Sequence, residues 1–253
     1  MAYSFSHIKT FEQCPLKYKY RYIDGIKVQG ESIESFLGNM IHKALRRLYQ
    51  SKMQEREVSL DDLLAYYETV WDNKWHEEIS IVRKEYSAED YKERGKACLL
   101  QYYRRYAPFN QARTLGVEFR VDIPLEADFK FSGLVDRLDQ RKDGILEIHD
   151  YKSSGSLPSQ KEIDKDRQLA LYHIGLQNEG DAPDIDLVWH YLVFNKEFRS
   201  RRSERELRML KQEMVSKIRE VEGTTVFRAQ KSPLCEWCEY QGLCDKETRT
   251  WEE

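Results

Sequence analysis

FSGLVDRLDQRKDGILEIHDYK, residues 131–152, is the stretch that decides the fold of this chain. Two runs of strand-forming residues flank a polar segment that ends in Gly144. A three-residue loop over 142–144, with the glycine left-handed, would place Arg141 opposite Ile145 and therefore Asp136 opposite Asp150. A two-residue loop over 143–144 would instead oppose Asp136 to Tyr151 and separate the two carboxylates.

The three-residue loop gathers charged side chains at the open end of this hairpin. Paired residues share a face with Cβ atoms about 4.5–5.5 Å apart, which is close enough for two carboxylates to bind one divalent cation. Side chains alternate along a strand, so Asp150 and Lys152 share a face while Tyr151 points to the core. The alternative is a solvated edge strand with alternating charge.

The elements around the hairpin follow from hydrophobic periodicity. Helical spacing covers Phe36, Leu37, Met40, Ile41, Ala44, Leu45 and Leu48. Further helices are expected at about 60–78, 88–106, 164–177 and 204–222. Strands are expected at about 117–123, 129–140, 145–151 and 187–194. This order predicts a mixed α/β fold with a small mixed central sheet flanked by helices.

Length and composition are compatible with one domain. The chain has 253 residues, 40% of them hydrophobic and 34% charged, which suits one core with additions and argues against disorder. The net charge of -3 neither supports nor excludes a nucleic-acid partner. No apolar run reaches the roughly 18 residues of a membrane span, and the start MAYSF lacks a secretory signal pattern. A cytoplasmic protein without membrane contact is expected.

Five cysteines are present, and three lie close together as Cys235, Cys238 and Cys244. Cys14 is the obvious fourth ligand of a metal or cluster. Zinc, an iron–sulfur cluster and plain structural thiols all remain open on spacing alone. Cys98, within Ala97-Cys-Leu-Leu, is expected to be a core thiol.

Three more polar residues are candidates for a site. His42 lies at the margin of the helical stripe one turn after Gly38, where a bare patch would leave room for a phosphate or a metal. Gln168 and Tyr172 are four residues apart and share a helix face, where an amide and a phenol can bond to phosphate. The alternative for these residues is an ordinary, partly buried helix surface.

The charged motifs resemble those of a known family. Gly133-x-x-Asp136-Arg137 followed by Asp150-Tyr151-Lys152 resembles the PD-(D/E)XK nuclease superfamily. Further matches resemble its RecB-like branch, which includes CRISPR-associated exonucleases with a four-cysteine iron–sulfur cluster. They are YSFSHIKTFEQCPLKY (3–18), Gly38-x-x-x-His42, Gln168-x-x-x-Tyr172 and the terminal cysteines.

The resemblance implies a restriction-endonuclease-like core and a set of site residues. It makes His42, Asp136, Asp150 and the Tyr151 carbonyl ligands of Mg²⁺ or Mn²⁺. Lys152 becomes the catalytic lysine, with Gln168 and Tyr172 beside it, and Glu118 matches a weaker acidic position. The ligands of a [4Fe-4S] cluster would be Cys14, Cys235, Cys238 and Cys244.

A single nuclease domain over 1–253 follows from the same resemblance. It would comprise a helical N-terminal part (about 1–110), a nuclease core (about 111–222) and a cysteine segment (about 223–253) that joins Cys14. The expected activity is hydrolysis of phosphodiester bonds, mainly in single-stranded DNA or at DNA ends. The setting would be DNA repair and recombination or CRISPR spacer processing, with recombination proteins or a CRISPR integrase as partners. The rival hypothesis is a non-catalytic DNA-binding or scaffold protein with a cysteine cluster.

Two basic segments are candidate phosphate tracks. One comprises Lys17, Lys19 and Arg21 among Tyr18, Tyr20 and Tyr22; the other comprises Arg199, Arg201, Arg202, Arg205 and Arg208. The tyrosines would either stack on the bases of a single strand or pack inward.

Overall fold

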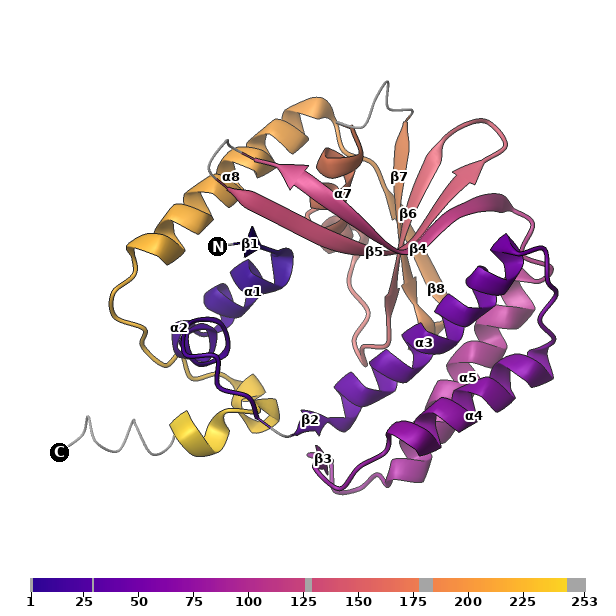
Figure 1. The fold of residues 1–253 in the computed structure, drawn as a ribbon, viewed down its shortest axis with the longest axis horizontal. Helices are drawn as coiled ribbons and strands as arrows, with labels where there is room; N and C mark the ends of the chain where they lie inside the picture. Colours follow the sequence, from indigo (N-terminus) through magenta and orange to yellow (C-terminus); the bar gives the residue numbers. More distant parts are fainter. Residues whose placement is uncertain (1, 29, 126–128, 178–183, 245–253) are drawn as a thin grey trace.

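The computed structural model describes residues 2–28, 30–125, 129–177 and 184–244. Their architecture is mixed α/β, with a twisted central sheet between two groups of helices (Figure 1). The expected fold class is therefore confirmed.

The sheet is built around the long strand β5 (Lys130–Arg141). It pairs along its length with antiparallel β4 (Ala112–Pro124), and on its other edge with β1 (Ala2–Tyr3) and β6 (Leu146–Lys152). β6 pairs in parallel with β7 (Ile185–Tyr191), which pairs antiparallel with β8 (Lys196–Ser200).

The β5–β6 hairpin has the register that a three-residue loop requires. Arg141 donates its backbone N–H to the Ile145 carbonyl at 2.9 Å, and Gly144 is left-handed with φ of 88°. The ladder runs from Gln140–Leu146 to Arg137–His149 and stops there. Asp136 and Asp150 are next in register, at the point where the two strands diverge.

One face of the sheet is covered by three long helices, α3 (Ile33–Met53), α4 (Leu60–Lys74) and α5 (Ala88–Tyr106). Each begins at a serine whose side chain accepts a backbone N–H of the first turn, which satisfies a donor that the helix itself cannot pair. Apolar residues of the three helices pack with Tyr151 and Leu192 into one core. No helix in the described part of the chain is long and apolar enough to cross a bilayer.

The opposite face carries α1 (Phe5–Gln13), α7 (Gln168–Gln177) and α8 (Glu204–Gly223). α7 is buried from Leu169 to Leu176, because α8 covers it on one side and the sheet on the other. Shorter elements complete this side and the connections: α2 (Pro15–Tyr18), α6 (Gln160–Ile163), the π-helix η1 (Lys19–Ile23), and the 3₁₀ turns η2 (Leu192–Phe194) and η3 (Pro233–Trp237).

The two ends of the described chain meet away from the sheet. Leu16 and Tyr20 form a small buried cluster with Tyr240, and the N-terminal helices lie beside the last described residues (Figure 1).

The expected long helices and main strands are present, with differences at several ends, such as Lys74 for the helix expected over 60–78, and in the short elements. α7 begins at Gln168, because residues 164–167 form a turn after α6. β7 ends at Tyr191, since Leu192–Phe194 is a 3₁₀ turn. The short strands β1, β2 (Glu31–Ser32), β3 (Ile79–Ser80) and β8 were not expected, because two to five residues give too short a run for periodicity.

A glycine in α7 tests the packing of this helix on β4. A Cβ at Gly175 would lie 2.5 Å from Val121 Cγ2 and 3.0 Å from the Asp122 carbonyl oxygen. The helix propensity gained by Gly175→Ala is about 1 kcal/mol, whereas overpacking costs about 1–3 kcal/mol. We expect urea unfolding to show a net loss of up to about 2 kcal/mol. Gly223→Ala is the control, since nothing lies within 4 Å of its Cβ, and it should cause no loss.

Candidate active site

The site lies where β5 and β6 diverge, and Asp136 bridges the gap between them. Its Oδ2 accepts the backbone N–H of Tyr151 at 2.9 Å. This hydrogen bond to a side chain replaces the backbone hydrogen bond that the Tyr151 N–H would make if the β5–β6 ladder continued. The Asp136 carboxylate is thereby held beside Asp150 on the neighbouring strand.

His42 reaches the same point from α3. Its Nε2 lies 2.9 Å from the Tyr151 carbonyl oxygen, and its Nδ1 lies 3.3 Å from Asp136 Oδ1. Desolvation opposes protonation, but the hydrogen bond to Asp136 and the charges of Asp136 and Asp150 outweigh it and raise the pKa of His42. Protonation of the imidazole lets both ring nitrogens donate, one to the Tyr151 carbonyl and one to Asp136.

Asp150 and Lys152 form an ion pair on one face of β6. The Lys152 Nζ lies 2.7 Å from Asp150 Oδ2, yet that oxygen is buried and has no well-directed hydrogen bond. Burial and the nearby Asp136 charge raise the pKa of Asp150 to about 6. The Asp150 charge outweighs desolvation at Lys152 and raises the pKa of that amine, which is therefore an ammonium at neutral pH.

Two residues of α7 extend this arrangement. Gln168 accepts a hydrogen bond from Lys152 Nζ at 3.0 Å and donates from its Nε2 to the Tyr172 hydroxyl at 3.3 Å. Tyr172 packs directly on Gly133, where a Cβ would lie 2.0 Å from the ring. The glycine three residues before Asp136 is therefore explained by the space that this ring occupies.

Glu118 lies in register with Asp136, on the far side of β5 from Asp150. Its backbone is left-handed with φ of 47°, and its carboxylate pairs with Arg46, one turn after His42 on α3. Gly38 is close to Ser153, whose Oγ would lie 3.0 Å from a Cβ there. The bare patch expected beside His42 is thus partly covered by this hydroxyl.

A groove of about 740 Å³ lies beside His42 and Asp136. His42, Asp136, Glu118, Leu134 and Ser153 line it together with Lys43 and Lys74. Leu134 is 51% exposed and adds an apolar side chain to this lining. The groove therefore combines carboxylates, ammonium groups and an apolar surface.

The predicted ligands fit a divalent cation by their chemistry. Two carboxylates, an imidazole and a backbone carbonyl are typical ligands of Mg²⁺ or Mn²⁺. The buried Asp150 oxygen without a directed hydrogen bond and the raised pKa of its carboxyl both indicate that positive charge is needed here. The Lys152 ammonium pairs with Asp150, and the His42 imidazole contacts Asp136.

A comparison with models of protein families shows to which family the chain belongs. The family model described as "PD-(D/E)XK nuclease superfamily" matches residues 2–245. The chain belongs to the PD-(D/E)XK nuclease superfamily. The superfamily consists of metal-dependent nucleases, which makes DNA the substrate class to consider, and its fold agrees with the mixed sheet seen here.

The other comparisons are less informative. A solved structure titled "Crystal structure of SSO0001" matches with a TM-score of 0.38 and 16% identity, covering 92% of this chain and 94% of that one. No curated protein matches the chain.

A second polar cluster was not expected from the sequence. Asp139, Glu147 and His149 have ligand atoms within 4.8 Å of one another and are buried. They lie on the opposite face of the hairpin from Asp136 and Asp150, because odd steps along a strand change the face. The sequence does contain an indication of this cluster. The alternating pattern of the two strands assigns one face to the core, and four polar or charged residues lie on that face: Arg137, Asp139, Glu147 and His149.

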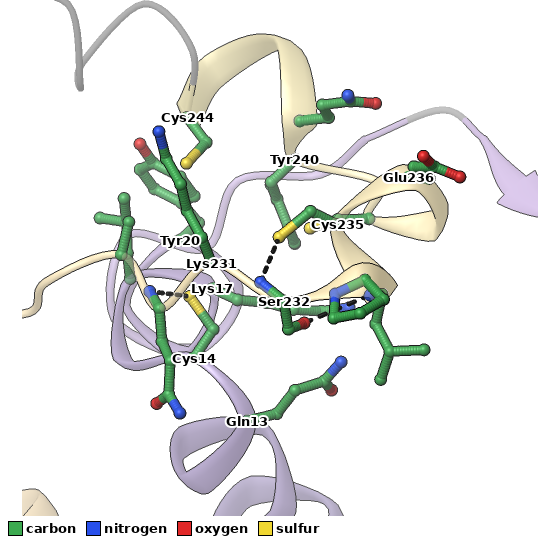
Figure 2. Close-up of a pocket in the computed structure, with 17 residues that line it drawn as sticks. Gln13, Cys14, Lys17, Tyr20, Lys231, Ser232, Cys235, Glu236, Tyr240 and Cys244 are labelled. Carbon is green, nitrogen blue, oxygen red and sulfur yellow. Dashed lines mark hydrogen bonds between the residues drawn. The ribbon is translucent and has the colours of Figure 1, made fainter.

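Four of the five cysteines line one pocket of about 390 Å³ between the two chain ends (Figure 2). Cys14 comes from the turn after α1, and Cys235, Cys238 and Cys244 from the last described residues. Cys14 Sγ accepts the backbone N–H of Gln230 at 3.4 Å, and Cys235 Sγ accepts that of Ser232 at 3.3 Å. Cys98 is buried in the core between α3, α4 and α5, as expected.

The basic segments are largely engaged within the protein. Lys17 and Arg21 pair with Glu239, Arg199 with Glu147, and Arg201 with Asp186. Arg202 donates to the backbone carbonyls of residues 163 and 166. Tyr18 and Tyr20 are buried, so these two tyrosines pack inward and do not stack on bases.

The raised pKa of Asp150 predicts a pH-dependent response to metal. A cation binds the ionised carboxylate, so protonation below about pH 6 competes with Mn²⁺ and lowers its affinity about tenfold per pH unit. Without metal, the raised pKa makes the free energy of unfolding fall as pH rises through about 6. We expect Mn²⁺ to raise Tm clearly at neutral pH and by less at pH about 5.

Thermal unfolding with and without MnCl₂ across this pH range measures the effect. Asp136→Asn should abolish the Mn²⁺ shift at every pH. A shift in the wild type that is equally large under acidic conditions would contradict the role of Asp150.

Proposed function

We propose that this protein is a Mg²⁺- or Mn²⁺-dependent deoxyribonuclease that hydrolyses phosphodiester bonds, mainly in single-stranded DNA or at DNA ends. The observation that carries the proposal is the meeting of His42, Asp136, Asp150 and Lys152 at the diverging end of one hairpin. Membership of the superfamily supports it.

His42, Asp136, Asp150 and the Tyr151 carbonyl would hold the cation. When bound, the ion lowers the pKa of a water molecule and neutralises charge on the phosphate. Asp136 is oriented by the Tyr151 N–H, which leaves its Oδ1 turned toward His42. The imidazole suits Mn²⁺ better than Mg²⁺.

Lys152, Gln168 and Tyr172 act on the substrate side of the site. With its pKa raised, Lys152 stays protonated and stabilises the negative charge that develops on the phosphate. Gln168 accepts from the same ammonium and fixes its direction. Burial raises the pKa of Tyr172, so this phenol stays neutral and can donate a hydrogen bond to a phosphate oxygen.

The groove beside the site supports single-stranded DNA or free ends as substrate. Lys43 and Lys74 offer positive charge for the backbone, while the exposed Leu134 offers an apolar surface to an unpaired base. The phosphate contacts predict a marked salt dependence of binding.

We further propose that Cys14, Cys235, Cys238 and Cys244 hold a [4Fe-4S] cluster that clasps the two ends of a single nuclease domain. All four line one pocket, and backbone N–H groups point at two of the sulfurs. Zinc is the alternative occupant of the same four thiolates.

DNA repair and recombination or CRISPR spacer processing, in the cytoplasm, are the proposed settings. Recombination proteins or a CRISPR integrase would then be the partners. A non-catalytic DNA-binding scaffold is the rival, and it predicts binding without cleavage.

Replacing the ammonium at position 152 tests catalysis. Lys152→Met should lower kcat on labelled single-stranded DNA with Mn²⁺ about 100- to 1000-fold, because it removes one preorganised charge from the transition state. Binding measured with Ca²⁺ should persist. Lys142→Met, in the loop at the other end of the hairpin, is the matched control and should cleave normally. Equal rates for both variants, or cleavage that survives a chelator, would refute the site.

The cysteines allow an equally direct comparison. Protein purified without oxygen should be brown, with an absorbance maximum at about 400 nm. Cys238→Ser should lose this band and the bound iron, whereas Cys98→Ser should keep both because Cys98 lies in the helical core. Stoichiometric zinc without iron in the wild-type protein would show that the four cysteines bind zinc and not an iron–sulfur cluster.

A further inference from the structure

Arg137 is a charged residue at the centre of the protein that the proposed catalytic groups do not include. It is 4% exposed and lies under α3 and α5. Its Nη1 donates to the hydroxyls of Tyr102 at 2.6 Å and Tyr151 at 2.7 Å, and its guanidinium carbon lies 3.9 Å from the centre of the Tyr49 ring. Tyr49 and Tyr102 share a further hydrogen bond of 2.7 Å.

The same guanidinium organises the buried acidic cluster. Its Nη2 lies 2.9 Å from His149 Nδ1, which leaves the ring proton on Nε2. That Nε2 lies 3.4 Å from both Asp139 Oδ2 and Glu147 Oε2. Although burial opposes ionisation, Arg137 lowers the pKa of Asp139 to about 2, and the bonds from His149 and Arg199 lower that of Glu147 to about 2.

These contacts argue against a metal ion in the cluster. An ion bound to His149 Nε2 would require the ring proton to move to Nδ1, where it would face the Arg137 donor. Arg137 Nε also lies 3.0 Å from the Asp139 oxygen that an ion would use. The positive charge that the cluster needs is therefore supplied by arginine.

Tyr151 connects this network to the active site. Its ring is buried against Arg137, its N–H donates to Asp136 Oδ2, and its carbonyl oxygen contacts His42 Nε2. β7 fixes the other edge of β6 at this residue, but the β5 ladder has already ended at Arg137–His149. On the β5 side, the hydrogen bond from Arg137 to the phenol holds Tyr151 where its backbone N–H and carbonyl meet Asp136 and His42.

We propose that Arg137 and the Tyr151 phenol are positioning residues that set the metal affinity of the nuclease site from the opposite face of the sheet. This inference rests on the proposed function. The buried guanidinium holds the phenol, the phenol fixes the direction of the Tyr151 peptide, and the peptide aims the carbonyl, Asp136 and His42 at one point.

Tyr151→Phe and Tyr49→Phe test the proposal as a matched pair. Each removes one hydroxyl from the same buried network, but only residue 151 contributes a peptide to the site. Isothermal titration calorimetry should show Mn²⁺ binding about tenfold weaker in Tyr151→Phe and unchanged in Tyr49→Phe. A purely structural role would instead give both variants the same lowered Tm and the same Mn²⁺ affinity, and this result would overturn the proposal.

Two additional measurements distinguish a failure of this inference from a failure of the proposed function. An Mn²⁺ ion retained by Asp150→Asn but lost in His149→Gln would place metal in the acidic cluster and overturn the positioning role of Arg137. A wild type that binds Mn²⁺ yet leaves DNA intact contradicts the proposed function alone, and the two tyrosine variants still decide the inference.

Discussion

The early end of the β5–β6 ladder is the constraint on which the site depends. The strands separate after the Arg137–His149 pair, so Asp136 and Asp150 are adjacent in register without being locked by backbone bonds. The Asp136 side chain then accepts the Tyr151 N–H that a continuing ladder would have used. The hairpin register brings the carboxylates together, and the divergence opens the space in which α3 places His42.

Electrostatics explain why so many cations surround this point. Two carboxylates that are close together and partly removed from water raise the pKa of one of them, here Asp150. The Lys152 ammonium pairs with Asp150, and the charges of Asp136 and Asp150 raise the pKa of His42 against desolvation. On the opposite face of the hairpin, Arg137 and Arg199 place positive charge beside Asp139 and Glu147. There the pKa of both carboxyls is lowered, whereas that of Asp150 is raised. One hairpin therefore carries two carboxyls with lowered pKa values on one face and a carboxyl with a raised pKa on the other.

Much of this arrangement could be predicted from the sequence, for identifiable reasons. The three-residue loop fixed the register, and the 3.6-residue and two-residue periods located the long helices and the main strands. The convergence of His42 with Asp136 came from the family resemblance, since no local rule relates α3 to β5. The roles of Gly133 and Gly38 became clear only with Tyr172 and Ser153 in place, because both are contacts between residues distant in sequence. The network around Arg137 was missed because charged residues on a strand suggest solvent, whereas here mutual pairing makes their burial tolerable.

The packing of Leu16 and Tyr20 on Tyr240 has a consequence for biosynthesis. Leu16 and Tyr20 are synthesised before strands β4 to β8, whereas Tyr240 is synthesised after them. Their apolar surfaces therefore lack this partner until those strands have left the ribosome. A chain released before Tyr240 would complete every strand of the sheet and still expose the hydrophobic patch by which chaperones and proteases recognise unfinished proteins.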